Sequence, residues 1–268
     1  MEHIIILMEI YKGEFKKNNK DGHGIYYYTN RDIYKGEFKN DLKEGYGIMY
    51  NSNGDKYEGE FKNNLRDGYG IQYFSNGNIY KCRWKDDKIE GYGIIILSDG
   101  FRYEGEFKNG LYEGYGKTYE FGKIRSEAEF KNDLKEGYGI YYYPNGHIYK
   151  GEFKNNYKDG YGIYYYPNKG RYEGEFKNDK IEGYGTFYFL NGDRYEGVFK
   201  NGIFNGYGNF YSSLGLKLER KFKFDIYTKI LLIIYKILLF LNHMREIFIK
   251  NKMAFFLIII LILGIIIN

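Results

Sequence analysis

The chain has 268 residues, of which 36 are Gly, 34 Tyr and 21 Phe, against only 2 Pro, 1 Cys and 1 Trp. This composition excludes collagen, a low-complexity linker and general disorder, and a single cysteine excludes a disulfide framework or a cysteine-based zinc site. The net charge of +5 lies near the C-terminus, because residues 218–268 hold 8 Lys/Arg and 3 Asp/Glu, which leaves 32 of each sign in residues 1–217. Residues 1–217 are therefore neutral and lack the excess of Lys and Arg that is typical of a nucleic-acid-binding domain. We expect no nucleic acid partner.

Residues 1–10 begin the chain and contain the apolar run Ile4–Leu7. Glu2, not a basic residue, precedes this run, and no small-residue cleavage site follows it, which argues against a signal peptide. We expect this N-terminal edge segment to pair with, or cover, the first edge of the sheet that the following residues predict.

Residues 11–217 consist of nine consecutive copies of a 23-residue unit, without an insertion. Such a period indicates a repeat architecture. Each position in a copy is named by its offset from the first residue of that copy, which is offset 0. The nine copies begin at Tyr11, Tyr34, Tyr57, Tyr80, Tyr103, Ser126, Tyr149, Tyr172 and Tyr195.

Three columns of the repeat hold most of its glycine. Offsets 11 and 13 are Gly in all nine copies, and offset 2 is Gly in seven, with Cys82 and Ala128 as the exceptions. Offset 4 is always aromatic: Phe in eight copies and Trp84 in one. Glycine inside a strand favours close approach of another group, so we expect an aromatic ring to lie over the bare backbone.

Each copy predicts one β-hairpin. Offsets 0, 2 and 4 are Tyr, Gly and Phe, and they alternate with mostly charged residues, as in a half-buried strand. Tyr, Ile and Tyr at offsets 12, 14 and 16 predict a second strand. A polar turn such as residues 39–45 joins the two, and an Asn/Gly cluster such as residues 51–54 leads to the next copy.

The motif Tyr-Glu-Gly-Glu-Phe-Lys-Asn-Gly at residues 103–110, with Gly-Tyr-Gly at 114–116, resembles the MORN (membrane occupation and recognition nexus) repeat. The resemblance covers residues 11–217. It implies an all-β fold: an elongated, twisted, single-layer antiparallel β-hairpin array, the MORN-like solenoid. Two strands per repeat at about 4.8 Å each predict a length of roughly 85–90 Å. As family roles, the resemblance implies contact with acidic phospholipids and with proteins.

Offset 5 is Lys in every copy, and Lys223 continues the column. A row of lysines suits multivalent contact with anionic headgroups. The alternative is a solvated row of lysines paired with Glu at offset 3 on the same face, where exposed ion pairs contribute little to stability. Taken by itself, the offset-5 column favours this alternative, because residues 1–217 are neutral overall. With lysines of the C-terminal part, the candidates for lipid contact are Lys16, Lys39, Lys62, Lys85, Lys108, Lys131, Lys154, Lys177, Lys200, Lys229, Lys236, Lys250 and Lys252.

Residues 80–148 contain the departures from the repeat pattern. Cys82, Trp84, Ile94 and Ile96 are candidates for a patch that contacts a partner, and Ser126 and Ala128 depart in the same region. We expect a bend or a specific groove there.

The sequence offers no catalytic, cofactor or metal site. The four His residues occupy unrelated repeat positions and form no metal-binding spacing. The Gly-x-Gly of offsets 11–13 precedes a strand, not the helix that a phosphate site needs. Asp or Glu fills offset 10 in eight copies, but equivalent carboxylates on an open sheet have no pocket to separate their pKa values. We expect these carboxylates to accept backbone hydrogen bonds.

The chain beyond the array is apolar and basic. Residues 218–225 are a partial tenth repeat. Residues 226–250 predict an amphipathic helix with a basic stripe every seven residues, either at a membrane interface or across the last edge strand. Residues 253–267 are fifteen apolar residues, about 22 Å as a helix against a hydrocarbon core of roughly 30 Å.

This last segment predicts a short C-terminal tail anchor. Lys250 and Lys252 can reduce the mismatch by extending to the interface, and they keep the array in the cytosol by the positive-inside rule. The alternative is a core or capping helix. We therefore expect a non-catalytic, membrane-associated scaffold that meets acidic phospholipids or an unidentified protein partner. The first alternative is a soluble interaction module whose C-terminal helices cap the sheet or drive homodimerisation, and the second is a regulatory subunit of an enzyme in trans.

Overall fold

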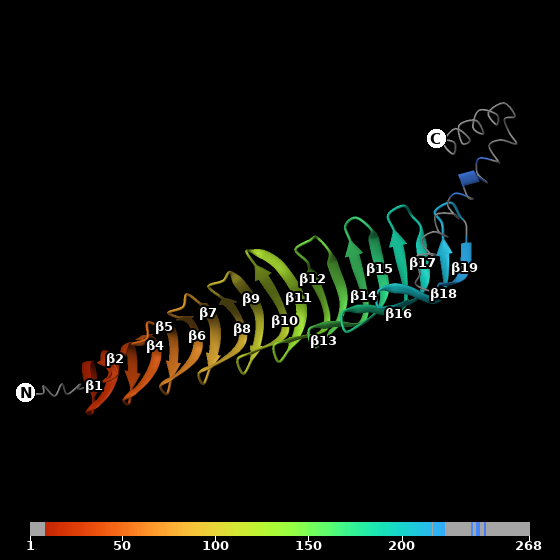
Figure 1. The fold of residues 1–268 in the computed structure, drawn as a ribbon. Helices are drawn as coiled ribbons and strands as arrows, with labels where there is room; N and C mark the ends of the chain where they lie inside the picture. The colour runs from red at the N-terminus through yellow and green to blue at the C-terminus, as the bar shows by residue number, and fades with distance from the viewer. Residues whose placement is uncertain (1–8, 216, 223–236, 238–239, 242–243, 245–268) are drawn as a thin grey trace, which may run out of the picture.

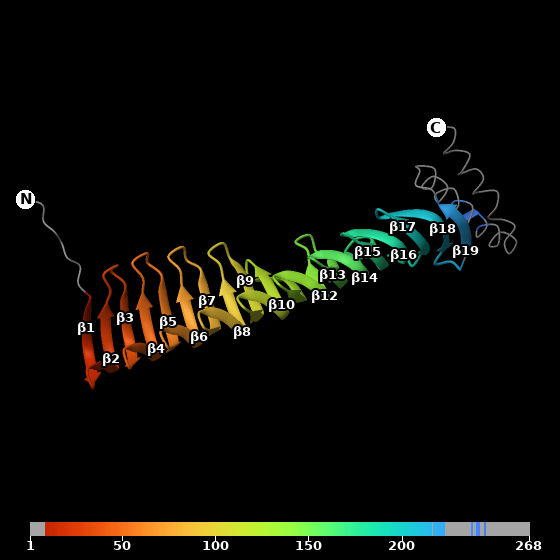
Figure 2. The same ribbon diagram turned by 90° about the horizontal axis from the view of Figure 1, so that it is seen from below.

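The computed structural model describes residues 9–215 and 217–222, and residues 237, 240, 241 and 244 of the C-terminal part. In them, 19 strands form one open antiparallel sheet, and successive strands of the chain pair with each other. The sheet is a long, twisted strip with β1 at one end and β19 at the other (Figures 1 and 2). The expected all-β hairpin array is confirmed, whereas the expected helical tail lies outside the described residues.

The two strands of each repeat follow one another along the strip. The strands are β1 (Ile10–Lys16), β2 (Asn19–Tyr27), β3 (Ile33–Lys39), β4 (Leu42–Tyr50), β5 (Lys56–Lys62), β6 (Leu65–Tyr73), β7 (Ile79–Lys85), β8 (Lys88–Ile96), β9 (Phe101–Lys108), β10 (Leu111–Glu120), β11 (Lys123–Lys131), β12 (Leu134–Tyr142), β13 (Ile148–Lys154), β14 (Tyr157–Tyr166), β15 (Gly170–Lys177), β16 (Lys180–Phe189), β17 (Arg194–Lys200), β18 (Ile203–Tyr211) and β19 (Lys217–Phe222).

The turn inside each hairpin is shorter than the sequence pattern predicted. Lys39 pairs directly with Leu42, so the turn consists of Asn40 and Asp41, with φ of 49° and 67°. Positive φ at both central residues is the geometry of the tight hairpin turns, which Asn and Asp tolerate. The remaining residues of the predicted turn belong to β4, where Gly45, with φ of 66°, faces a register shift in β3.

The tyrosine at offset 0 lies flat on the glycines of two neighbouring strands. Tyr34 has no exposed surface, and its hydroxyl donates to the Glu37 carbonyl at 3.1 Å. A Cβ on Gly47 would lie 2.3 Å from the Tyr34 hydroxyl, and a Cβ on Gly36 would lie 2.5 Å from the Cα of Gly47. Only glycine leaves room for the ring, which confirms the expectation that an aromatic covers bare backbone.

The aromatic residues of offsets 0 and 4 form a continuous row that we call the aromatic spine. Phe61 stands edge-on between two tyrosines, with its ring centre 5.1 Å from those of both Tyr34 and Tyr57. Phe61 is 5% exposed, whereas Phe15, which has no preceding repeat, is 62% exposed. Edge-to-face aromatic pairs contribute about 0.5–1.5 kcal/mol each beyond burial, so the spine joins each repeat to the next.

The spine is interrupted where offset 2 is not glycine. The Sγ of Cys82 would lie 2.7 Å from a Cβ on Gly93, and Tyr80 packs instead on Phe74, with ring centres 4.8 Å apart. Ser126 brings no ring at all, and its hydroxyl bonds to that of Thr118 at 2.6 Å. The buried core accordingly divides into two clusters, one ending at Phe130 and the other beginning at Tyr149.

Candidate functional site

The sheet has two faces of different chemistry. Offsets 1, 3, 5 and 12 lie on what we call the charged face, where Tyr46, for example, donates to Glu58 at 2.9 Å. Offsets 0, 4, 9, 15 and 17 lie on the aromatic face, which carries the spine. Both faces run the whole length of the array.

The offset-5 lysines, from Lys16 to Lys200, are all exposed on the charged face. Where they form ion pairs, the partner is the offset-10 carboxylate of the preceding repeat: Lys85 meets Asp67 at 2.7 Å, and Lys177 meets Asp159 at 3.1 Å. The hydrogen bond from Lys85 lowers the pKa of Asp67. That these lysines contact lipid stays a prediction, and Lys229, Lys236, Lys250 and Lys252 lie outside the described residues.

The alternative pairing of these lysines with Glu at offset 3 is wrong for the described part of the array. The Glu37 carboxylate accepts the backbone N–H of Tyr46 at 3.1 Å and lies against Gly45. The same bond to the bulge is formed by Glu14, Glu60, Glu152 and Glu175, so these glutamates are directed at the backbone and away from the lysine row.

The offset-10 carboxylates accept backbone hydrogen bonds, as expected. Glu44 accepts the N–H of Asn63 at 3.0 Å, and Glu90 accepts that of Asn109 at 2.8 Å. Each such bond joins one repeat to the turn of the next. These carboxylates therefore hold the edge of the strip together.

The residues proposed as a partner patch occupy two environments. Cys82 and Trp84 are buried in the spine, and burial raises the pKa of the Cys82 thiol to about 12. Ile94 and Ile96 are half-buried. A partner patch at these positions stays a prediction. The structure also shows a row of exposed tyrosines at offset 12, which the recurrence of Tyr in that column signals.

A second column, at offset 9, became apparent only in the structure. It is apolar in repeats 4, 5, 8 and 9 and cationic in the other five, where the cations stand over the aromatic rings. Lys43 Nζ lies 5.5 Å from the ring centre of Tyr34 and 5.2 Å from that of Phe61. Burial lowers the pKa of Lys43 and of Lys135. The cationic members are Lys20, Lys43, Arg66, Lys135 and Lys158.

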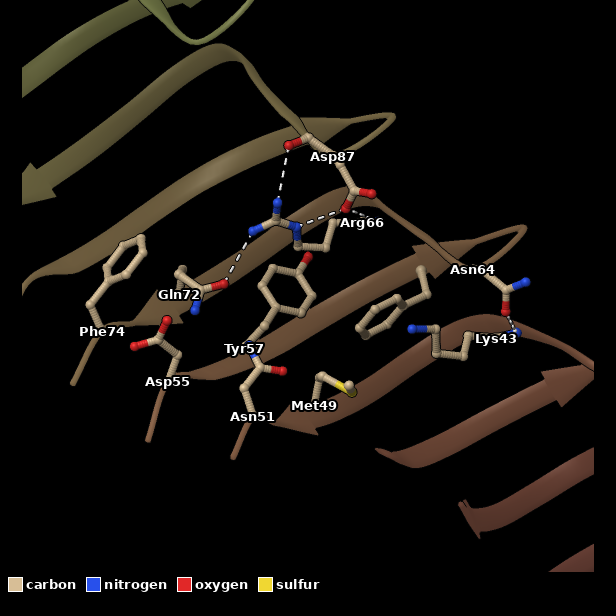
Figure 3. A pocket seen from close by; sticks show the side chains of 11 residues that line it. Lys43, Met49, Asn51, Asp55, Tyr57, Asn64, Arg66, Gln72, Phe74 and Asp87 are labelled. Carbon is tan, nitrogen blue, oxygen red and sulfur yellow. Dashed lines mark hydrogen bonds and ion pairs between the residues drawn. The ribbon is translucent and has the colours of Figure 1, made fainter. Parts of the chain in front are cut away.

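The aromatic face is hollowed over Tyr57 by a cavity of about 300 Å³, shown in Figure 3. In repeats 1, 6, 7 and 8, offsets 15 and 17 are both aromatic, and the rings lie over the equivalent surface, as Tyr164 and Tyr166 do with centres 4.6 Å apart. The residues that line the cavity are Lys43, Met49, Asn51, Asp55, Tyr57, Phe61, Asn64, Arg66, Gln72, Phe74 and Asp87.

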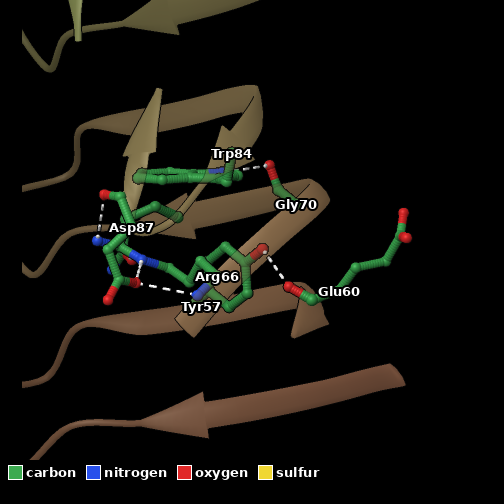
Figure 4. Close-up of polar contacts among 7 residues, drawn as sticks. Tyr57, Glu60, Arg66, Gly70, Trp84 and Asp87 are labelled. Carbon is green, nitrogen blue, oxygen red and sulfur yellow. Dashed lines mark hydrogen bonds and ion pairs between the residues drawn. The ribbon is translucent and has the colours of Figure 1, made fainter. Parts of the chain in front are cut away.

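Arg66 is held on one side of this cavity by a dense set of contacts (Figure 4). Its Nε donates to Asp87 Oδ1 at 2.8 Å, its Nη1 donates to Gln72 Oε1 at 3.1 Å, and its guanidinium lies 4.0 Å from the ring centre of Trp84. Trp84 in turn donates to the Gly70 carbonyl at 3.3 Å. The guanidinium is thus fixed in place, and its charge is balanced by Asp87.

Neither a metal-ion site nor a membrane-spanning helix is found among the described residues. Among them, no group of three His, Cys, Asp or Glu side chains is placed to hold a metal ion. In the same part of the chain, no helix has the length and hydrophobicity to cross a membrane. The segments predicted to contact the membrane, 226–250 and 253–267, lie outside the described residues apart from four isolated positions.

The comparison with solved structures yields only distant likenesses. The SAS-4 (dCPAP) TCP domain of Drosophila melanogaster, solved with a proline-rich motif of Ana2, aligns at 16% identity over 66% of this chain and 90% of that one, with a TM-score of 0.38. A virginiamycin B lyase of Staphylococcus aureus aligns at 13% identity over 80% and 74% of the two chains, with a TM-score of 0.16. Both likenesses are too distant to indicate a shared function. No curated protein sequence matches this chain.

The sequence model of the MORN repeat matches nine times, and seven of the matches begin at offset 0. The other two begin after Cys82 and at residue 127, where the tyrosine-on-glycine pair is broken. The matched residues are 11–33, 34–56, 57–79, 83–102, 103–119, 127–148, 149–171, 172–194 and 195–213. The chain belongs to the MORN repeat family.

Proposed function

We propose that the protein is a non-catalytic, membrane-associated scaffold whose array presents an extended surface to partners. The observation that supports this most directly is the open sheet itself, with an exposed lysine row on one face and a row of cations over aromatic rings on the other. Repeats spaced by about 10 Å favour multivalent contact over a single deep site.

The membrane part of the proposal rests on residues 226–268. The apolar run 253–267 acts as a tail anchor, and Lys250 and Lys252 hold the array on the cytosolic side. The offset-5 lysines add contact with acidic phospholipid headgroups, which salt weakens.

Flotation with vesicles tests this proposal directly. The full chain should float at high salt, the 1–217 truncation should not, and Ile260→Lys should reduce insertion by about 2.5–3.5 kcal/mol on an insertion scale. Protease protection should leave the array accessible from the cytosolic side. A full chain that stays soluble at high salt without detergent would instead support the soluble module, with its C-terminal helices capping the sheet or forming a homodimer.

The irregular repeats give a second test, on protein partners. Restoring the repeat pattern at Cys82, Trp84 and Ile96, and changing Ile94 to the Lys found at its offset in the next repeat, should weaken capture of a partner while the array still folds. Unchanged capture would show that these departures do not define the contact surface.

A further inference from the structure

The cavity over Tyr57 is a specific feature of two repeats and not of the architecture. Where offsets 15 and 17 are both aromatic, as in Tyr141 and Tyr143 with ring centres 4.7 Å apart, the rings cover the spine. Repeat 2 has Met49 and Asn51 at these offsets, and repeat 3 has Gln72 at offset 15. Smaller and polar side chains at these offsets therefore open the face over Tyr57.

Among the described residues, the charges in the cavity leave one cation without an ion-pair partner. Asp87 is occupied by Arg66, and Asp55 accepts the backbone N–H of Ser75 at 2.8 Å. Lys43 Nζ forms no ion pair in this part of the chain, and its contacts there are aromatic rings. Because the Lys43 ammonium is partly buried, we expect it to bind an anion that carries apolar groups beside its charge.

The walls of the cavity define the rest of the ligand. Met49 and Phe61 supply apolar surface on the side of the ammonium, while Phe74 lies at the far end beside Gln72, whose amide is directed to Arg66 (Figure 3). Lys43 and the neighbouring Met49 and Phe61 therefore offer one cationic and one apolar surface to a ligand.

We propose that this cavity binds the carboxylate of an acidic side chain in a partner protein, on a segment whose acidic residue faces Lys43 and whose neighbouring apolar residues face Met49 and Phe61. The inference rests on the proposed scaffold function and adds the face, the site and the chemistry of the partner. It does not depend on the membrane tail, so its test uses a soluble peptide and is separate from flotation.

The test uses Trp84, the single tryptophan, as the reporter, since its ring stacks on the Arg66 guanidinium at the cavity wall. The full chain in detergent is titrated with the peptide N-acetyl-Ala-Glu-Leu-Leu-amide and with its Gln counterpart. We expect a saturable fluorescence change with the Glu peptide and about tenfold weaker binding of the Gln peptide, because only the first supplies a charge for Lys43. Equal affinities, or no binding of either peptide, would overturn the proposal.

Matched variants locate the site. Lys43→Met should weaken the Glu peptide about tenfold and leave the Gln peptide unchanged, while Lys135→Met, at the same offset over Tyr141, should change neither. The double variant Met49→Tyr with Asn51→Tyr should fill the cavity and abolish binding, with circular dichroism to confirm the fold. If that variant does not fold, Lys43→Met and Lys135→Met decide the question.

Inorganic phosphate separates a carboxylate site from a general anion site. We expect phosphate to compete no better than chloride at the same ionic strength. Competition by phosphate as strong as by the Glu peptide would overturn the assignment to an acidic protein segment and favour a phosphate-bearing ligand. If vesicle flotation succeeds and peptide binding fails, this inference falls and the membrane proposal stands.

Discussion

Repeats 2 and 4 carry the same aromatic offsets but pack them differently. In repeat 2, Tyr34 lies on Gly36 and Gly47 and is fully buried. In repeat 4, Cys82 replaces the first glycine, and Tyr80 is only partly buried. One side chain at offset 2 therefore decides whether a tyrosine joins the spine, because the ring and a Cβ cannot occupy the same place.

Repeat 6 shows what a longer interruption does. Ser126 and Ala128 replace both the ring and its glycine, and the core there divides into two clusters. In a repeat array, stability is a sum of local terms and terms between neighbours. The weak junction predicts that the two halves unfold as separate units.

The largest expected effect is alkaline unfolding of the regular repeats. Burial raises the pKa of Tyr34, Tyr57, Tyr103, Tyr149 and Tyr172, and that of Tyr195 to about 12. Because the unfolded state ionises first, stability is full below pH 10 and falls as pH rises, by about 1.4 kcal/mol per pH unit for each such tyrosine. The phenolate absorbance of these buried tyrosines should appear together with the loss of circular dichroism between pH 10 and 12, in addition to the absorbance of the exposed tyrosines of offset 12. Ionisation of these rings in a folded array would contradict the burial.

Phe61→Ala should remove the ring that joins repeats 2 and 3. A buried Phe→Ala change costs about 3–5 kcal/mol, measured by denaturant unfolding. Phe15→Ala is the matched control, since this ring is 62% exposed, and it should cost far less. Phe153→Ala, at the start of the second cluster, should behave like Phe61→Ala. Loss of binding with an unchanged thermal midpoint would show that offset 4 is a contact position.

Gly36→Cys transfers the break of repeat 4 into repeat 2. The new Cβ would lie 2.5 Å from the Cα of Gly47 and 2.6 Å from the Tyr34 hydroxyl, so the ring must leave. We expect a loss of about 1–3 kcal/mol, as for other overpacked cores. Calorimetry measures this loss. A stability equal to that of the parent chain would show that the Tyr34 ring and a side chain at position 36 can be accommodated together.

Ser126→Tyr combined with Ala128→Gly should repair the junction of repeat 6. The gain is about 0.5–1.5 kcal/mol for each new edge-to-face contact, less about 1 kcal/mol for the lost Thr118 hydrogen bond. Trp84 fluorescence reports the unfolding of the first cluster, whereas circular dichroism reports that of the whole array. The two unfolding curves should differ in the parent chain and coincide in the variant. Coincident curves in both would contradict two unfolding units.

The repeat register, the strands and the role of the glycine columns were predictable from the sequence alone. These follow from local rules, because strand alternation assigns each offset to a face and a ring of fixed size needs the two bare glycines beside it. The hairpin turn was predicted too long, since Asn40 and Asp41 close it alone by adopting positive φ.

Which side chains meet between repeats depends on the three-dimensional arrangement of the strands. Lys177 pairs with Asp159 of the preceding repeat, not with Glu175 near it in sequence, because the bulge directs Glu175 to the backbone N–H of Tyr184. The cavity beside Lys43 likewise combines Met49 of one repeat with Gln72 of the next and Asp87 of the one after that. Such contacts depend on strand register and twist, which place residues about 20 positions apart side by side.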